Sequence, residues 1–357
     1  MKRVVVAGFS NHLAGTEAVI KNYVSALKGR ISFDMLVTEE PTNYMDLFDG
    51  DNRYFVLPNK RRHPLAHTGA VSRHFAEHHG EYDAVWSNLN ILNNLDALRL
   101  GARYGIPKRI LHAHNSQNNG ALHQRVLCAI HKPTFQGYLT DRWACSREAG
   151  DYFFPNDDYV IIPNAINEAE YAFDAAARTR VRRELGVGED ALLVGAVGRL
   201  VPEKNYGFLV DLWPRVLEAS PEARLCVVGT GELEGELRQK VESAGLGDHV
   251  LLPGGTRDMA SFYSAFDVFA MPSLFEGLPV SLLEAQFNGL PCVLSDQISR
   301  ESVVTEGLAM LSLSEPEQWA DALVHASREG VRFNERADTY RLVVQADRVE
   351  ALFKEGL

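Results

Sequence analysis

Long apolar runs and paired cysteines are missing from this sequence of 357 residues. Its longest apolar runs, such as residues 4–7 and 191–194, fall far short of the roughly 20 residues that cross a bilayer, so no membrane span is expected. The first residues lead directly into a Val-rich segment, without the apolar stretch and cleavage site of a secretory signal. The four cysteines lie far apart and show neither metal-binding nor redox spacing. A cytosolic protein with reduced, mostly buried thiols is expected.

The chain also has no excess of positive charge. Residues 1–165 carry 18 Lys and Arg against 16 Asp and Glu, whereas residues 166–357 carry 18 against 31. An acidic protein without a basic stripe is a poor binder of nucleic acid, so nucleic acid is excluded as a partner. One local basic cluster, Lys60-Arg61-Arg62-His63, precedes an amphipathic pattern. It is either a solvated loop or a contact with anionic lipid or a lipid diphosphate, which would place the protein at the inner face of the membrane.

Short apolar runs alternate with segments of helical period along nearly the whole chain, which is typical of parallel sheets covered by helices. The alternation restarts near residue 191, after a Pro/Asn turn at residues 163–167 and an acidic, Ala-rich stretch. We expect an N-terminal domain over 1–165, a second domain over 166–335, and a final helical segment, 336–357, that packs on the first domain. Open parallel sheets bind ligands at the carboxyl ends of their strands, so the expected site is a cleft between two facing sheets.

The pattern also places the individual elements. In the first domain we expect strands near 3–9, 32–38, 53–57, 84–88, 108–114, 142–146 and 159–163, with helices over 15–28, 65–79, 93–104 and 121–136. In the second domain we expect strands near 191–197, 224–229, 249–252, 267–271, 291–295 and 308–313, with helices over 205–219, 232–244, 258–265, 278–288 and 315–328.

The strongest chemical signal is the stretch Phe275-Glu276-Gly277-Leu278-Pro279-Val280, which follows an expected strand. Proline suits a first helical turn, so a helix should begin at Pro279 with its free N–H groups available to a phosphate. Glu276 before the helix and Glu284 inside it can each accept two hydrogen bonds, which matches the vicinal diol of a sugar or a ribose. The alternative is that Glu284 is an ordinary exposed residue and Glu276 a favourable charge near a helix N-terminus.

A second signal, Gly198-Arg199 followed by Lys204, lies after the strand that opens the second domain. Glycine lets backbone approach a ligand, while Arg199 offers a planar fork and Lys204 a point charge for a diphosphate. Such a pair could stabilise a departing nucleotide diphosphate without a metal ion. The alternative is that both are surface cations.

Three weaker features remain open. His112 and His114 end a strand on the same side, but no further ligand completes a metal site, so a substrate contact of His114 or a structural histidine is favoured. Asp49-Gly50-Asp51 has the D-x-D form of a metal motif, although its neighbours favour a turn. Gly15 precedes a helix and is either a phosphate-approach turn or a plain junction. The chain has no G-x-G-x-x-G, P-loop or G-x-S-x-G motif, which argues against NAD enzymes, P-loop kinases and hydrolases.

In this order and at these spacings, the motifs resemble family 4 of the retaining glycosyltransferases, which have the GT-B fold. The resemblance spans nearly the whole chain. Stretches similar to residues 112–116, 163–167 and 276–296 recur in bacterial exopolysaccharide and capsule glycosyltransferases. The fold class that it implies is α/β, with two Rossmann-like parallel-sheet domains facing each other across a cleft: an acceptor-binding N-terminal domain and a C-terminal domain that binds the nucleotide-sugar donor.

The resemblance also implies roles for single residues. Glu276 would contact the donor sugar and Glu284 the ribose diol, Arg199 and Lys204 would bind the diphosphate, and His114 would contact the donor sugar. The implied catalytic residues are Glu276, His114, Arg199 and Lys204. The implied donor-binding residues are Gly15, Gly198, Arg199, Lys204, Gly255, Thr256, Glu276, Gly277, Leu278, Pro279, Val280 and Glu284. Ala14-Gly15 departs from the Gly-Gly of many members, so its phosphate turn could be tighter.

The activity implied by the resemblance is transfer of a hexose, with retention and without a metal or other cofactor, from a nucleotide-diphosphate sugar. Family frequency favours UDP, and the acceptor is expected to be a saccharide or a lipid-linked saccharide of a surface polysaccharide. A transferase with a small soluble acceptor is the first alternative. A nucleotide-sugar epimerase of the same fold and a non-catalytic sugar-nucleotide-binding subunit are the others.

Overall fold

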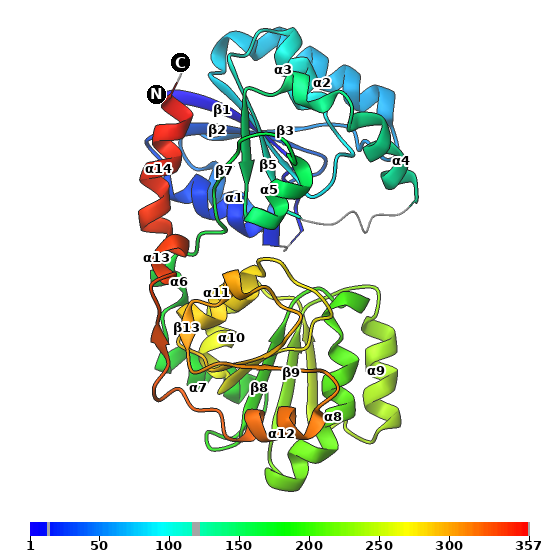
Figure 1. Cartoon of the computed structure of the whole chain (residues 1–357), viewed down its shortest axis with the longest axis vertical. Helices are drawn as coiled ribbons and strands as arrows, with labels where there is room; N and C mark the ends of the chain where they lie inside the picture. The colour runs from blue at the N-terminus through cyan, green and yellow to red at the C-terminus, as the bar shows by residue number, and fades with distance from the viewer. Residues whose placement is uncertain (13–14, 116–121, 356–357) are drawn as a thin grey trace. The chain divides into compact units, whose positions relative to one another are not determined.

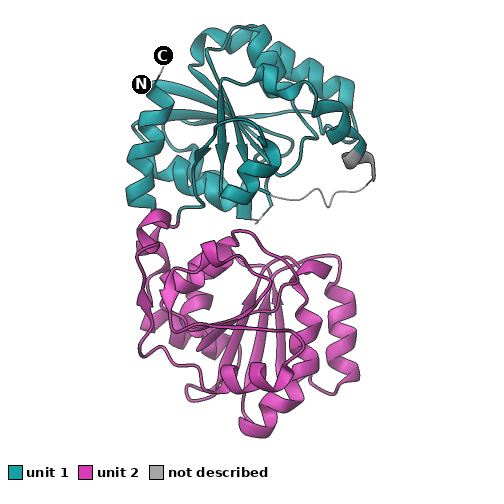
Figure 2. Ribbon diagram, in the orientation of Figure 1, with its two compact units in different colours: residues 1–165, 342–357 teal, residues 166–341 magenta. Residues whose placement is uncertain are grey.

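The structure, a computed structural model, describes residues 1–12, 15–115 and 122–355. It divides into two compact units, unit 1 (Met1–Ala165 with Leu342–Leu357) and unit 2 (Ile166–Arg341), which Figure 2 colours separately. The first boundary falls where the Pro/Asn turn was expected. The second lies at Arg341, six residues beyond the expected residue 335, because Arg341 pairs with Ile166 at the start of unit 2.

Unit 1 is built on a parallel sheet of seven strands in the order β3-β2-β1-β4-β5-β6-β7. Its strands are β1 Lys2–Ala7, β2 Ile31–Val37, β3 Arg53–Val56, β4 Ala84–Leu89, β5 Lys108–Ala113, β6 Asp141–Ala144 and β7 Val160–Ile161. Its helices are α1 Gly15–Ala26, α2 Pro64–His78, α3 Asp96–Arg103, α4 Leu122–His131, α5 Arg147–Phe153 and α14 Leu342–Lys354. Each strand and helix predicted for this part of the chain is confirmed, and α5 is an addition (Figure 1).

Unit 2 has the same kind of architecture, with a parallel sheet of six strands in the order β10-β9-β8-β11-β12-β14. Its strands are β8 Leu193–Val197, β9 Arg224–Val228, β10 Val250–Gly254, β11 Val268–Met271, β12 Cys292–Ser295 and β14 Ala309–Leu311, with a separate antiparallel pair, β13 Thr305–Glu306 and β15 Arg332–Phe333. Its helices are α6 Glu168–Tyr171, α7 Ala175–Glu184, α8 Tyr206–Ala219, α9 Glu234–Ser243, α10 Met259–Ala265, α11 Val280–Phe287, α12 Pro316–Val324 and α13 Ala337–Tyr340. The predicted elements of this domain are confirmed as well.

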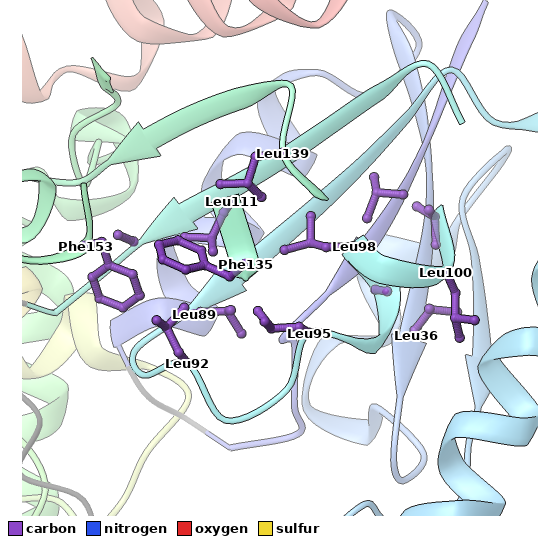
Figure 3. Packing of buried hydrophobic residues seen from close by; sticks show 14 of the residues in the cluster. Leu36, Leu89, Leu92, Leu95, Leu98, Leu100, Leu111, Phe135, Leu139 and Phe153 are labelled. Carbon is purple, nitrogen blue, oxygen red and sulfur yellow. The ribbon is translucent and has the colours of Figure 1, made fainter. Parts of the chain in front are cut away.

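Both faces of the sheet of unit 1 are covered, which explains why its strands read as continuous apolar runs. On one face Val85 and Leu111 pack with the apolar side chains of α2, α3 and α5, part of the cluster drawn in Figure 3. The opposite face carries Trp86 and Trp143, whose rings lie 5.7 and 5.1 Å from that of Phe353 on α14. The last helix of the chain therefore completes the core of the first unit.

The helix expected over residues 336–353 is broken in two. Arg341 has extended backbone (φ −76°, ψ 123°) and separates α13 from α14. The cause is its strand-like pairing with Ile166, whose N–H donates to the Tyr340 carbonyl over 2.7 Å. The two chain segments that join the units thus lie side by side within unit 2.

Candidate functional site

In unit 2 the motif residues gather at the carboxyl ends of neighbouring parallel strands. Gly198 follows β8 and donates its N–H to the Val228 carbonyl of β9 over 3.1 Å. Gly229, at the end of β9, has φ +152°, and a Cβ there would lie 1.9 Å from the Gly198 carbonyl oxygen. The glycines therefore let two strand-end loops touch through their backbones. Sequence reasoning missed this packing role of Gly229.

Lys204 and Glu276, both predicted as site residues, form an ion pair. Lys204 Nζ lies 2.5 Å from Glu276 Oε1, and the two side chains are only 16% and 17% exposed. Lys204 ends the short 3-10 helix Pro202–Lys204, and Glu276 lies in the loop between β11 and α11. The two loops are joined because the Leu274 N–H donates to the Glu203 carbonyl over 2.8 Å. The fold thus brings together residues that are 72 positions apart.

Two buried hydroxyls have no hydrogen-bond partner among the described residues, one on the first residue of α8 and the other on a residue that follows β11. Tyr206 is 6% exposed, and a Cβ on Gly198 would lie 2.7 Å from its hydroxyl oxygen and 3.2 Å from Lys204 Cε. Burial, and to a smaller extent the charge of Glu276, raises the pKa of Tyr206, so the phenol stays protonated. Ser273, fully buried after β11, is the second such hydroxyl. Neither residue carried a signal in the sequence.

Glu284 lies within α11, which begins at Val280 with Pro279 as its N-cap. Its side chain is 7% exposed, so its interpretation as an ordinary exposed residue is wrong. The hydroxyl of Tyr171 donates to Oε1 and that of Tyr263 to Oε2, each over 2.8 Å. The carboxylate is therefore held from α6 and α10, by two tyrosines that sequence reasoning did not find.

The remaining predicted residues of unit 2 lie around this group. Arg199 is exposed and makes no ion pair with any described residue. Gly277 and Leu278 are half-buried in the loop that leads into α11. At the end of β10, a Cβ on Gly255 would lie 3.6 Å from Thr230 Cγ2, and the Thr256 hydroxyl accepts the Asp258 N–H over 3.0 Å.

In unit 1, His114 follows β5, and its Nε2 donates to Asn88 Oδ1 of β4 over 2.9 Å. Burial lowers the pKa of His114 to about 3. Its imidazole is therefore neutral at pH 7. His112 donates from Nε2 to the Ile162 carbonyl over 3.1 Å inside the core and is a structural histidine. Gly15 is the first residue of α1, whereas Ala14 and Ser116 lie outside the described residues.

The structure also places two charged motifs that the sequence analysis singled out. Asp49-Gly50-Asp51 forms a turn, as its neighbours predicted, with Gly50 at φ +82°. Within the basic cluster, Lys60 turns inward and its Nζ lies 2.6 Å from Asp96 Oδ2, which leaves Arg61, Arg62 and His63 exposed.

The four cysteines carry free thiols, three of them buried, which confirms that part of the sequence prediction. Over the residues that the structure describes, no helix combines the length and apolarity that crossing a membrane requires.

Residues 191–329 match the family described as glycosyl transferases group 1. A Bacillus subtilis protein named as the glycosyltransferase EpsF is 30% identical over 343 residues, which cover 92% of this chain and 88% of that protein. The UDP-Gal:alpha-D-GlcNAc-diphosphoundecaprenol alpha-1,3-galactosyltransferase of Escherichia coli is 27% identical over 205 residues, 54% of this chain and 53% of its own. The chain belongs to the group 1 glycosyltransferase family.

Solved structures agree in fold. Anabaena HepE in complex with UDP-glucose superposes with a TM-score of 0.78 at 18% identity and covers 99% of this chain and 100% of its own. The lipopolysaccharide glycosyltransferase WaaG superposes with a TM-score of 0.70 at 15% identity, over 99% and 100% of the two chains. The two parallel-sheet α/β units are those of a GT-B glycosyltransferase, as the sequence predicted.

Proposed function

We propose that this chain is a retaining glycosyltransferase of family 4 that uses a UDP-sugar and extends a saccharide or a lipid-linked saccharide during assembly of a surface polysaccharide. The observation that carries the proposal is the half-buried Lys204–Glu276 pair at the strand ends of unit 2. Two names support the substrate class: the E. coli relative uses UDP-Gal and a diphosphoundecaprenol acceptor, and HepE is solved with UDP-glucose.

The chemistry of unit 2 suits a nucleotide-diphosphate sugar. Lys204 and the exposed Arg199 supply positive charge for a diphosphate, and the first N–H groups of α11 are unpaired within the helix and favour an anion. Glu276 can accept hydrogen bonds from sugar hydroxyls, and Glu284 from the ribose diol. The loop with Gly255 and Thr256 faces the base in this proposal.

The proposed reaction breaks the bond between the anomeric carbon and the β-phosphate oxygen. The acceptor hydroxyl forms its bond to the same face of that carbon, which preserves the configuration, and its proton passes to the departing phosphate oxygen. Lys204 and Arg199 stabilise the charge that develops on the diphosphate, which is a large term when such groups are already in place. No metal ion takes part, so a chelator leaves turnover intact.

His114 is proposed to contact the donor sugar from unit 1, with Gly15 near the phosphates. A neutral imidazole whose Nε2 is committed to Asn88 keeps Nδ1 as an acceptor, which suits a sugar hydroxyl rather than a phosphate. A test is His114→Asn, which should lower turnover while leaving the affinity for free UDP unchanged. An equal loss for UDP and for the UDP-sugar would count against a sugar contact.

A contact of unit 1 with anionic lipid is part of the proposal, because the acceptor is lipid-linked in one relative. Arg61 and Arg62 are exposed beside Leu65, whose side chain is 88% exposed at the start of α2. Basic residues next to an exposed apolar side chain fit the surface of an anionic membrane.

The donor site is tested by a thermal-shift screen of the protein against UDP, GDP, ADP and a panel of UDP-sugars, with and without EDTA. A ligand at 100 times its dissociation constant stabilises the fold by about 2.7 kcal/mol. We expect a shift with UDP that survives EDTA and is lost in Lys204→Ala and Glu284→Gln. Absence of any shift would reject the donor site.

A further inference from the structure

The carboxylate of Glu284 is held by a clamp of two phenols. Tyr171 donates to one oxygen from α6 and Tyr263 to the other from α10, both over 2.8 Å, while Glu284 itself belongs to α11. All three side chains are at least nine-tenths buried. The rings of the two tyrosines lie 6.0 Å apart at 63°, so the phenols reach the carboxylate from two directions.

We propose that Tyr171 and Tyr263 are positioning residues that orient the Glu284 carboxylate for the vicinal diol of a ribose. The inference rests on the proposed function, because it deepens the role of Glu284 in the donor site. An ionised carboxylate has two oxygens with about four lone-pair sites and no donor. One phenol on each oxygen fixes the rotation of the group, and a carboxylate held in one orientation is suited to two adjacent hydroxyls.

The Tyr263 phenol stays protonated over the working pH range. Burial, together with the charge of Glu284, raises the pKa of Tyr263 well above its usual value, so the hydroxyl keeps the proton that it donates. A donor that never ionises cannot repel the carboxylate. Because a phenol already donates to each oxygen, the carboxylate does not need to reorganise when a ribose arrives, and preorganised groups bind more tightly than mobile ones.

The alternative is a structural tie that only joins three helices. A tie and a positioning clamp differ in what they do to ligand selectivity. Loss of a tie lowers stability and affects all nucleotides alike, whereas loss of an orienting phenol weakens only those ligands that have both ribose hydroxyls. The ratio of affinities for a ribonucleotide and its 2′-deoxy counterpart therefore separates the two.

The experiment measures dissociation constants by calorimetry for whichever of UDP, GDP and ADP the wild-type protein binds, and for the 2′-deoxy form of that nucleotide. We expect the wild type to prefer the ribonucleotide by about tenfold or more, as for a hydrogen bond to a charged group. Tyr263→Phe and Tyr171→Phe should each reduce this preference to about threefold or less, mainly by weakening the ribonucleotide.

A matched control is Tyr340→Phe, which removes another buried phenol of unit 2 whose hydroxyl donates to the Glu301 carbonyl over 2.9 Å. It should leave the preference unchanged. Thermal denaturation of each variant confirms folding, and Tyr171→Phe provides the second test should Tyr263→Phe not fold.

Three results would overturn the inference. If the variants keep the wild-type preference and lose only stability, the tyrosines form a structural tie. If they bind the ribonucleotide more tightly, the phenols compete with the diol. If the wild type binds the ribonucleotide and its 2′-deoxy form equally, Glu284 does not hold the diol. Only failure of the wild type to bind any of the three nucleotides would remove the proposed function itself.

Discussion

Glu276 and Lys204 form a half-buried ion pair, with Oε1 and Nζ 2.5 Å apart. In the proposed complex they have different partners, the sugar hydroxyls and the diphosphate. Binding of the donor therefore exchanges one half-buried ion pair for two sets of ligand contacts. Breaking the Lys204–Glu276 pair costs free energy, which reduces the affinity for the donor. Removal of either partner should therefore affect binding and chemistry differently.

Glu276→Gln should separate binding from chemistry. The substitution keeps the size of the side chain but releases Lys204, so the affinity for free UDP should rise by about threefold to tenfold, within the range of partly buried ion pairs. Turnover of the sugar donor identified by the thermal screen should fall by about 100-fold or more, because the sugar loses a charged partner. Calorimetry and release of UDP measure the two effects.

Glu203→Gln is the matched control for this variant. Glu203 is exposed next to Lys204 in the 3-10 helix Pro202–Lys204. Its backbone carbonyl, not its side chain, accepts the hydrogen bond from the Leu274 N–H. The control removes the same charge without touching the pair, so its affinity and turnover should stay close to wild type. Unchanged turnover in Glu276→Gln would refute the proposed role of Glu276.

Gly229→Ala should destabilise unit 2. A Cβ at this position would lie 1.9 Å from the Gly198 carbonyl oxygen, and its φ of +152° is unfavourable for other residues. The free energy of unfolding should fall by about 2 kcal/mol or more in urea denaturation. Gly247→Ala, with nothing within 4 Å of the added Cβ, should change it by less than about 0.5 kcal/mol. Equal stability of the two variants would contradict the tight backbone contact.

The stability of unit 1 should fall as the pH is lowered. The pKa of His114 is lowered from 6.5 to about 3 in the folded protein, so below pH 6.5 the unfolded chain takes up more protons. Stability is therefore lost as the pH falls from 6.5 toward 3, by up to about 1.4 kcal/mol per pH unit for this one side chain. His74, lowered to about 4 mainly by burial, adds in the same direction.

His114→Gln tests the histidine itself, because a neutral amide does not titrate. The thermal midpoint of the variant should decline less steeply than that of the wild type between pH 6.5 and 5. Parallel curves would show that His114 does not contribute. Since the imidazole stays neutral over the same range, turnover of the wild type should show no ionisation step from His114.

Much of the fold could be predicted because its strands are buried on both faces and read as continuous apolar runs. The acidic, Ala-rich stretch after the Pro/Asn turn was assigned no helix, yet residues 175–184 form α7. Only a few of its positions face the core, and one of them is Arg182, fully buried because it donates to the Ala265 and Gly188 carbonyls. A buried cation satisfied by distant carbonyls gives no apolar period to detect.

The candidate site shows the same limit. The spacing of Glu276 and Glu284 indicated a sugar site, but Tyr171 lies 113 residues from Glu284 and no local pattern could reveal that contact. Lys60 looked like a solvated cation because Asp96, its partner, lies 36 residues further on. Local sequence shows which residue types are available, whereas burial and partner choice depend on how distant elements meet.

Membrane contact through unit 1 leads to the last prediction. Because Lys60 is bound to Asp96, the lipid contact depends on Arg61, Arg62 and Leu65. The protein should float with vesicles of phosphatidylglycerol and phosphatidylcholine but not with phosphatidylcholine alone, and binding should weaken as salt rises. The double variant Arg61→Glu with Arg62→Glu should remove about 2 kcal/mol or more of binding, at about 1 kcal/mol for each basic residue.

Two further variants locate the contact. Leu65→Ser should weaken flotation at all salt concentrations, because an apolar contribution is not screened. Arg215→Glu with Arg238→Glu reverses two exposed charges of unit 2 and serves as the matched control for net charge. If this control abolishes flotation as fully as the unit 1 variant does, the attraction depends on total charge and the surface at Arg61, Arg62 and Leu65 is not a docking site.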